Sequence, residues 1–152
     1  MRLFLKQDNF VEWSNGAAEY FPDHPVGHYT LLVAMRCRFG VLEEEQLALL
    51  DTASTWSFCR KDVADALGVS EADGFLDMKM STRLGQINGF LAKVGITLVS
   101  EFGQDLILEP TFFISSEWNG PNVLGWKTCI ESIRLAIDPS KNMLFFGNYG
   151  HV

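Results

Sequence analysis

The run DVADALGVS, residues 62–70, decides the fold that we predict from this sequence. Ala64 is small enough for two helices to cross closely, and Gly68 can adopt the positive φ that ends a helix. Val69 is placed to fill the angle between this helix and a second one. The run therefore predicts a helix over about 61–67, followed by a turn.

The segment behind this turn predicts a longer helix over 78–94. Its apolar residues recur at i, i+3, i+4 and i+7, which places one face of a helix inward; they are Ile87, Phe90, Leu91 and Val94. The polar residues then point largely outward, and they are Lys79, Thr82, Arg83, Gln86 and Lys93. Gly85 and Gly89 weaken this helix, because each costs about 1 kcal/mol relative to alanine in a helix interior.

The order of helix, turn, longer helix and hairpin resembles the winged helix-turn-helix, and is most similar to the effector domain of OmpR-type response regulators. The resemblance covers about residues 42–108 and rests on the apolar spacing of the second helix, on Gly95 behind it, and on a hairpin over 97–109. It implies an α+β fold, in which a winged helix-turn-helix core carries N- and C-terminal extensions of helix and strand.

The same resemblance implies a regulator that binds duplex DNA, with the 78–94 helix in the major groove. Arginine and glutamine are suitable side chains for reading guanine and adenine edges. The residues assigned to DNA are Lys79, Thr82, Arg83 and Gln86 on the reading helix, with Arg60, Lys61 and Lys93 on phosphates.

The charge of the chain favours a second interpretation. The net charge is −7, although affinity for DNA depends on lysine and arginine neutralising phosphates. Residues 54–100 are the least acidic part, with five acids against five bases. The alternative is an acidic adaptor or inhibitor, for example a phage-type antagonist of a host nucleic-acid-handling complex, that uses the scaffold without DNA. Its contact residues would be Glu43, Glu44, Glu45, Glu101 and Asp105.

We expect residues 1–152 to form a single domain, because the length suits one core and 47% of the residues are hydrophobic. The winged-helix core covers about 42–110, with an N-terminal extension over 1–41 and a C-terminal extension over 111–152. Further helices are expected over about 9–21, 43–53 and 123–137, and strands over 111–115 and 143–146. The run 29–39 fits either a helix or a strand, and its composition favours the helix.

The sequence predicts no enzyme, catalytic residue, metal or cofactor. Asp23, His24 and His28 have a spacing that could hold a metal on a helix, but Pro25 interrupts it and favours a polar turn. Cys59 lies beside two cations that could activate a thiol, yet no base accompanies it, so we expect a small buried residue. P-loop, GxGxxG and GxSxG motifs are absent from the sequence.

Three cysteines without CxxC pairing, no apolar run of about 18 residues, and no signal-peptide pattern predict a cytoplasmic protein that does not enter membranes. Its expected partner is duplex DNA or a basic protein, with a homodimer as a further expectation.

Overall fold

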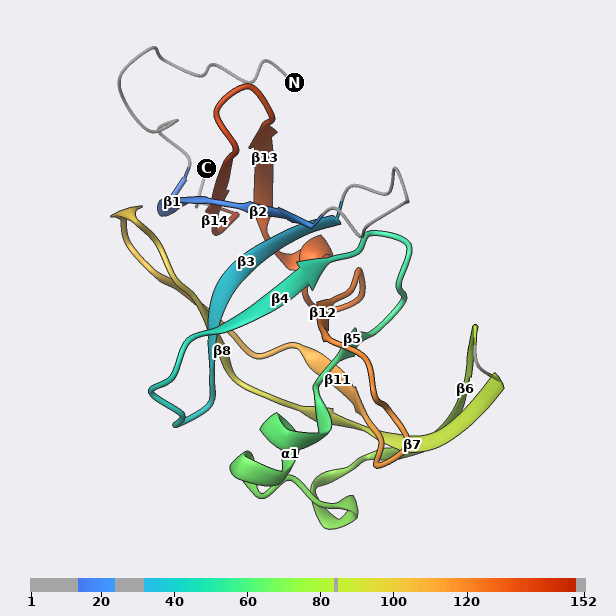
Figure 1. Cartoon of the computed structure of the whole chain (residues 1–152). Coiled ribbons are helices and arrows are strands. Elements are labelled where there is room, and N and C mark those ends of the chain that lie inside the picture. Colours follow the sequence, from blue (N-terminus) through green and yellow to red (C-terminus); the bar gives the residue numbers. More distant parts are fainter. Residues whose placement is uncertain (1–13, 24–31, 84, 150–152) are drawn as a thin grey trace.

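The computed structural model describes residues 14–23, 32–83 and 85–149, and within these ranges the chain is mostly β-structure (Figure 1). The larger of two sheets has ten strands. Its order is β10 (Leu106–Leu108), β8 (Ile96–Leu98), β3 (Leu32–Phe39), β4 (Gln46–Leu50), β12 (Asn122–Leu124), β5 (Ser57–Phe58), β11 (Thr111–Ile114), β7 (Gly85–Lys93) and β6 (Leu76–Thr82), with β2 (Phe21–Asp23) paired to β3.

The smaller sheet brings the two ends of the described chain together. Its order is β13 (Arg134–Asp138), β14 (Met143–Gly147), β1 (Gly16–Glu19) and β9 (Phe102–Gly103). One α-helix, α1 (Lys61–Leu67), and two short 3-10 turns, η1 (Glu71–Asp73) and η2 (Ile130–Ser132), complete the described elements. No helix in the described ranges is long and apolar enough to span a membrane.

In the large sheet, one strand is inserted between two strands that follow each other in sequence. The strands β4 and β5 follow each other in sequence, but β12 lies between them. It pairs parallel with β4, with Val123 opposite Leu49, and antiparallel with β5, with the same Val123 opposite Phe58. The turn that joins β4 to β5 must therefore pass over the end of β12.

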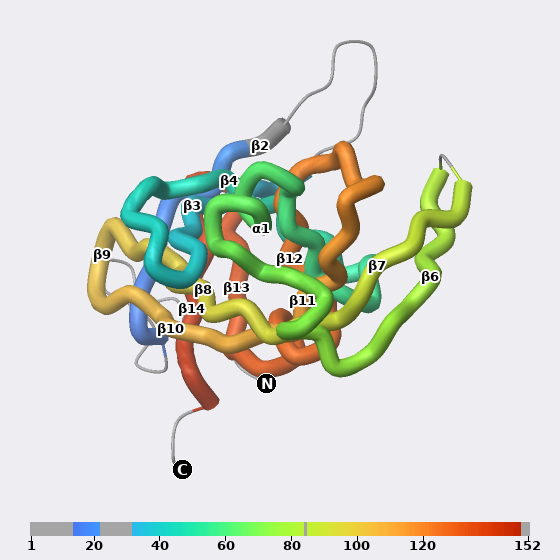
Figure 2. The backbone as a smooth tube through the Cα atoms, turned by 90° about the horizontal axis from the view of Figure 1, so that it is seen from below, coloured from blue at the N-terminus to red at the C-terminus, as the bar shows by residue number. Residues whose placement is uncertain are grey.

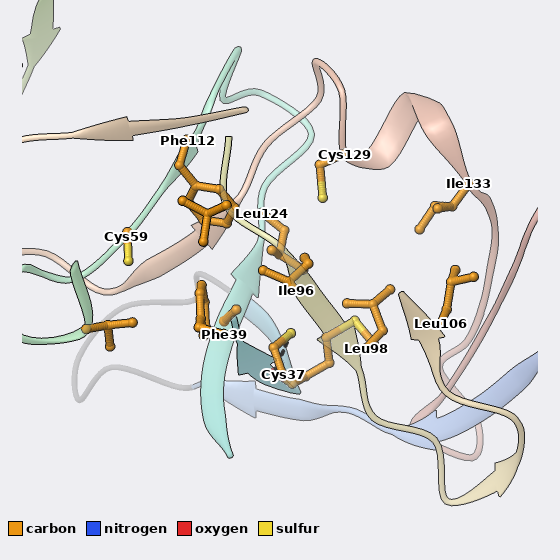
Figure 3. Close-up of a cluster of buried hydrophobic side chains, with 14 of the residues drawn as sticks. Cys37, Phe39, Cys59, Ile96, Leu98, Leu106, Phe112, Leu124, Cys129 and Ile133 are labelled. Carbon is orange, nitrogen blue, oxygen red and sulfur yellow. Dashed lines mark hydrogen bonds between the residues drawn. The ribbon is translucent and has the colours of Figure 1, made fainter. Parts of the chain in front are cut away.

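The main core contains side chains from both sheets, and Figure 3 shows part of it, with Phe39, Phe112 and Leu124 of the large sheet. Phe39 and Phe112 of the large sheet are fully buried, with ring centroids 5.8 Å apart in an edge-to-face arrangement. Leu144 and Phe146 of the small sheet belong to the same buried cluster. Burial of these large side chains is the dominant favourable contribution to folding.

The hairpin formed by β6 and β7 projects from the rest of the protein, as both Figure 1 and Figure 2 show. Its strands pair antiparallel from Leu76 opposite Leu91 to Thr82 opposite Gly85. Residues close to the core on β7 are buried, whereas those towards the tip are half-buried or exposed.

The predicted winged helix-turn-helix fold is wrong, although its first helix is correct. The structure has α1 over Lys61–Leu67, and Gly68 ends it in the left-handed conformation with φ 69°. The predicted helix over 78–94 is instead the β6–β7 hairpin. Gly85 has φ 114° at its turn, and a Cβ on Gly89 would collide with the Ile114 carbonyl and the Phe113 ring. The two glycines that weaken a helix thus belong to a turn and to a close strand contact.

Three other predicted helices are also wrong. Most of the helix over 43–53 is replaced by β4 and the turn behind it, and the helix over 123–137 by β12, η2 and β13. Residues 9–13 of the helix predicted over 9–21 lie outside the described ranges. The described remainder forms β1 and the start of β2 instead of a helix. The tertiary pairing of these segments overrode their local helix propensity.

The helix favoured over 29–39 is wrong for the part that is described, which is the strand β3. In β3, Met35, Cys37 and Phe39 are buried, while Arg36 between them is exposed. This alternation is the period of a strand with one face in the core. The strands predicted over 111–115 and 143–146 are confirmed as β11 and β14. A single domain over 1–152 stays a prediction; the large sheet takes strands from all three parts of the predicted division.

The three cysteines are free and buried in the core (Figure 3). Burial raises the pKa of the Cys59 and Cys129 thiols to about 12, with the Asp62 carboxylate adding to the effect on Cys59. Burial likewise raises the pKa of Cys37. The prediction that Cys59 is a small buried residue is therefore confirmed.

We expect a thiol reagent to label none of the three cysteines quickly in the native protein near neutral pH, because only an accessible thiolate reacts. All three should react at once in concentrated guanidinium. Mass spectrometry of labelled protein measures both states, and rapid labelling of Cys59 in the native state would contradict its burial.

Candidate active site at the Asp51 turn

Asp51 stands where two parallel strands end side by side. It follows directly on β4, and its backbone N–H donates to the carbonyl of Leu124, the last residue of β12, at 3.0 Å. Because the strands are parallel, both carboxyl ends meet at this edge of the sheet. The chain then turns over the end of β12 to reach β5.

The turn holds the Asp51 carboxylate in a fixed position. The Ala53 N–H donates to Asp51 Oδ1 at 2.9 Å, and the Ser54 N–H donates to the Asp51 carbonyl at 3.2 Å. Such a bond from the backbone two residues ahead is the usual Asx-turn arrangement. The residue is exposed, and its other carboxylate oxygen has no protein partner among the described residues. Within the part of the chain that the structure describes, that oxygen is open to water or to a bound molecule.

Residues behind β12 bind the far side of the same turn. The Trp126 N–H donates to the Ser54 carbonyl at 2.8 Å, and the Lys127 N–H donates to the Thr55 carbonyl at 2.9 Å. The Gly125 N–H donates to the Ser57 hydroxyl at 3.0 Å. Backbone hydrogen bonds with Leu124, at the end of β12, and with the residues behind it therefore fix the turn.

Gly125 allows the segment behind β12 to approach closely the backbone of Trp56 and Ser57. A Cβ at this position would overlap the Trp56 carbonyl and would lie 2.9 Å from the Ser57 nitrogen. These are backbone atoms, which cannot move aside as a flexible side chain can. Glycine is the residue that this contact requires.

Asn122 fixes the base of the site from within the protein. It is fully buried, and its Nδ2 donates to the Leu47 carbonyl of β4 at 3.2 Å. Its Oδ1 accepts the Arg60 N–H at the start of α1, at 2.9 Å. The buried amide thus joins β4, β12 and α1, and its polar atoms have the partners that burial demands.

An apolar cluster lies between the Asp51 turn and the β6–β7 hairpin. Its buried members are Phe58, Leu91, Phe113 and Val123. Partly buried side chains pack against them from the residues that flank Asp51, from the hairpin and from the loop behind β11, and these are Leu49, Trp56, Met78, Met80, Ile87 and Trp118. Figure 1 shows the turn behind β4 and the tip of the hairpin on the same side of the molecule. The carboxylate therefore lies at the edge of a surface that can accept apolar groups.

The residues predicted to bind DNA are not brought together on a helix. Lys79 and Thr82 lie on β6, Gln86 lies on β7, and Arg83 lies at the turn between them. Lys93 ends β7. These five residues are therefore spread along a hairpin rather than along one helix face.

The two remaining predicted phosphate contacts lie at α1. Arg60 precedes the helix and forms a salt bridge with Asp62 at 2.7 Å, and Lys61 is the first helical residue. Both residues are exposed, and only the backbone N–H of Arg60 is bonded to the site, through Asn122.

The acids of the alternative interface lie in two segments of the chain, one before β4 and the other between β8 and β10. Glu43, Glu44 and Glu45 are exposed in the loop before β4, with Glu45 lying 3.9 Å from Arg36. Asp105 accepts hydrogen bonds from the Ser100 N–H and hydroxyl, at 2.9 and 3.1 Å, and from Arg38 at 2.8 Å. The backbone hydrogen bond from Ser100 is the main reason that the pKa of Asp105 is lowered. Glu101, the residue directly before β9, is exposed.

The described residues contain no group of three or more His, Cys, Asp or Glu side chains that could hold a metal ion. His24 and His28 lie outside the described ranges, and Asp23 is described only as the last residue of β2.

The whole structure is similar to a crystal structure of a retropepsin-like aspartic protease from Rickettsia conorii. The TM-score is 0.51 at 15% sequence identity, and the match covers 91% of this chain and 97% of that one. The chain therefore has a fold similar to that of this protease. At this identity the likeness establishes the fold alone. No family model matches the sequence, and no curated protein is significantly similar to it in sequence.

This fold corrects the predicted functions. The DNA-binding regulator and the acidic adaptor both depended on a winged helix-turn-helix, and the chain has a mostly β fold like that of a protease instead. The prediction of a non-enzyme is wrong for the same reason, because the matched fold is one that an enzyme uses. The structure does not test duplex DNA, a basic protein or a second copy of the chain as partners.

The sequence contained a signal for the site that the helix predictions concealed. The run LALLDTAST (47–55) places an acid and small polar residues directly behind an apolar segment, as expected where a strand ends in a turn. The run NVLG (122–125) ends a second apolar segment in glycine. Assigning both runs to helices placed Asp51 on a helix surface, where an acid is ordinarily just solvated.

We expect Gly125→Ala to destabilise the protein by about 1–3 kcal/mol, because the added methyl group overpacks a rigid backbone contact. Gly95→Ala is the matched control, since a Cβ at Gly95 meets nothing within 4 Å. Denaturant unfolding of both variants measures the difference. Equal stability of the two would show that the turn does not approach Gly125 as the structure describes.

Proposed function

We propose that the protein is an aspartic peptidase in which Asp51 supplies the catalytic carboxylate. The observation that supports this most directly is the position of Asp51 at the end of two parallel strands, with one carboxylate oxygen held by the Ala53 N–H and the other exposed. The likeness in fold to an aspartic protease agrees with this chemistry.

The other described aspartates are less suited to the role. Asp62 is paired with Arg60, and Asp105 with Arg38 and Ser100. Asp73 closes the cap of η1, and Asp138 accepts hydrogen bonds from Ser140. Asp65 and Asp77 are exposed on α1 and β6, away from the ends of parallel strands. Asp51 is the described aspartate that combines a held carboxylate with an open oxygen beside an apolar surface.

Aspartic peptidase chemistry needs two carboxylates that share one proton. The chain supplies one such turn within its described ranges, so the second carboxylate is expected from a second copy of the chain. A symmetric dimer places the same turn of both copies on either side of its two-fold axis. The homodimer expected from the sequence is therefore retained as part of the proposal.

The reaction then proceeds by general acid–base catalysis. The ionised carboxylate of the pair takes a proton from a water molecule, whose oxygen attacks the carbonyl carbon of the peptide bond. The protonated carboxylate gives its proton to the carbonyl oxygen, and a tetrahedral intermediate forms. Proton transfer to the amide nitrogen and cleavage of the C–N bond release the amine and the carboxylic acid, and restore the shared proton.

The surroundings of Asp51 suit a bound peptide. Leu49 and Trp56 on either side of the turn, with Met80 and Ile87 of the hairpin, offer apolar surface to side chains that flank the cleaved bond. A peptide between the turn and the hairpin would be shielded from water, which strengthens the electrostatic interactions of the carboxylates.

We expect Asp51→Asn to reduce peptidase activity by about 10²–10⁴-fold, which is the usual contribution of a general acid–base group. The fold should persist, because the asparagine oxygen can still accept the Ala53 N–H. Asp65→Asn, an exposed change of the same chemistry on α1, is the matched control. Cleavage of a peptide library by the three proteins measures the effect, and full activity of Asp51→Asn would refute the proposal.

A mixing experiment tests whether the site needs two chains. If each active dimer requires Asp51 from both copies, about a quarter of the dimers in an equal mixture of parent and Asp51→Asn protein are active. The mixture should then show about half the activity of the same amount of parent alone. Activity equal to that of the parent alone would indicate a site complete within one chain.

The cytoplasmic location expected from the sequence stays a proposal. Three unpaired, buried cysteines favour a reducing compartment.

A further inference from the structure

The strand β11 pairs with the inner half of the β6–β7 hairpin but not with its outer half. Along β7, the residues from Phe90 to Lys93 pair with β11, from Ile114 to Thr111. The strand β11 ends at Ile114, and beyond that point β7 pairs with β6 alone. The projecting part of the hairpin therefore begins at Asn88 and Gly89.

Two side chains take the place of the missing strand at this point. The Asn88 N–H donates to Glu117 Oε2 at 2.7 Å, and the Ser115 hydroxyl donates to the Asn88 carbonyl. These are the two backbone groups that a longer β11 would have paired. Backbone polar groups at a strand edge require partners, and a carboxylate acceptor gives the stronger kind of hydrogen bond.

The turn that carries these side chains is itself held in place. The Ser115 hydroxyl also accepts the Glu117 N–H at 3.1 Å, and the Trp118 N–H donates to the Ser115 carbonyl at 3.3 Å. The Trp118 ring packs on Phe58 with centroids 4.7 Å apart, and its Nε1 donates to the Pro121 carbonyl at 3.0 Å. The turn that carries Ser115 and Glu117 is therefore held by its own hydrogen bonds and by the packing of Trp118 on Phe58.

Phe58 connects that support to the candidate site. It belongs to β5, which the chain enters directly from the Asp51 turn, and it pairs with Val123 of β12. Chain connections, the Phe58–Trp118 ring contact and the Glu117–Asn88 hydrogen bond together link the Asp51 turn to the hairpin. The hairpin on the other side of the apolar cluster is fixed relative to the carboxylate by these links.

We propose that Glu117 is a positioning residue of the Asp51 site, which holds the root of the β6–β7 hairpin at Asn88 and so sets the hairpin over a bound peptide. The effect on substrate rests on the proposed peptidase function, whereas the anchoring of Asn88 does not. Ser115 acts with Glu117, because its hydroxyl binds both the Asn88 carbonyl and the Glu117 N–H.

Amide hydrogen exchange of the purified parent, Glu117→Ala, Glu117→Gln and Glu109→Ala proteins tests the anchoring. We expect exchange at Asn88 and towards the tip to be about ten-fold faster in Glu117→Ala, because a hydrogen bond to a charged group is lost. Glu117→Gln keeps an acceptor oxygen and should restore much of the protection. Glu109→Ala, at an exposed glutamate outside the hairpin, should match the parent. Unchanged exchange at Asn88 in Glu117→Ala would overturn the anchoring.

Kinetics of the same variants test the role in substrate binding. A hairpin held less firmly should raise KM several-fold in Glu117→Ala while kcat changes less, with partial recovery in Glu117→Gln. Faster exchange with an unchanged KM would overturn the role of Glu117 towards substrate. If the parent shows no cleavage that depends on Asp51, the peptidase proposal fails, and with it the substrate role, while hydrogen exchange still decides the anchoring.

Discussion

The insertion of β12 between β4 and β5 is the constraint on which the rest of the structure depends. It places the ends of two parallel strands beside each other and forces the connecting turn to pass over one of them. Asn122, at the start of β12, binds backbone groups of Leu47 and Arg60, and Gly125, after its end, lets the turn approach. The position of Asp51 depends on this packing as well as on the local Asx-turn bond from Ala53.

The same insertion determines where an apolar surface forms. Val123 of β12 is buried with Phe58 of β5, and the hairpin packs Met80 and Ile87 against that cluster. The carboxylate therefore lies next to a surface on which apolar side chains lose contact with water. The carboxylate, the apolar surface and the projecting hairpin together support the proposed binding and cleavage of an extended peptide. The proposed cleavage needs a second carboxylate, which the symmetry of a dimer would provide.

Local sequence signals predicted some elements correctly and others wrongly for a common reason. The helix at 61–67 was predictable because Gly68 ends it within the segment itself. Residues 78–94 carry apolar positions that fit a helix, but Gly85 and Gly89 serve a turn and a contact with Phe113, which lies far away in sequence. The run QLALL (46–50) has good helix formers throughout, yet it pairs with β3 and β12 on either side. Pairing between distant segments supplied more stabilisation than helix propensity could.

The sequence by itself determined a chain with enough apolar residues for a core, three cysteines that stay unpaired, and one short helix closed by glycine. Only the tertiary structure decided that Asp51, rather than the charged residues of the hairpin, lies at the meeting point of two strands. The reason is physical: the Asp51 N–H donates to the carbonyl of Leu124, and the N–H groups of Trp126 and Lys127 donate to carbonyls of the turn. These residues are more than seventy positions away along the chain, and no local pattern around Asp51 records them.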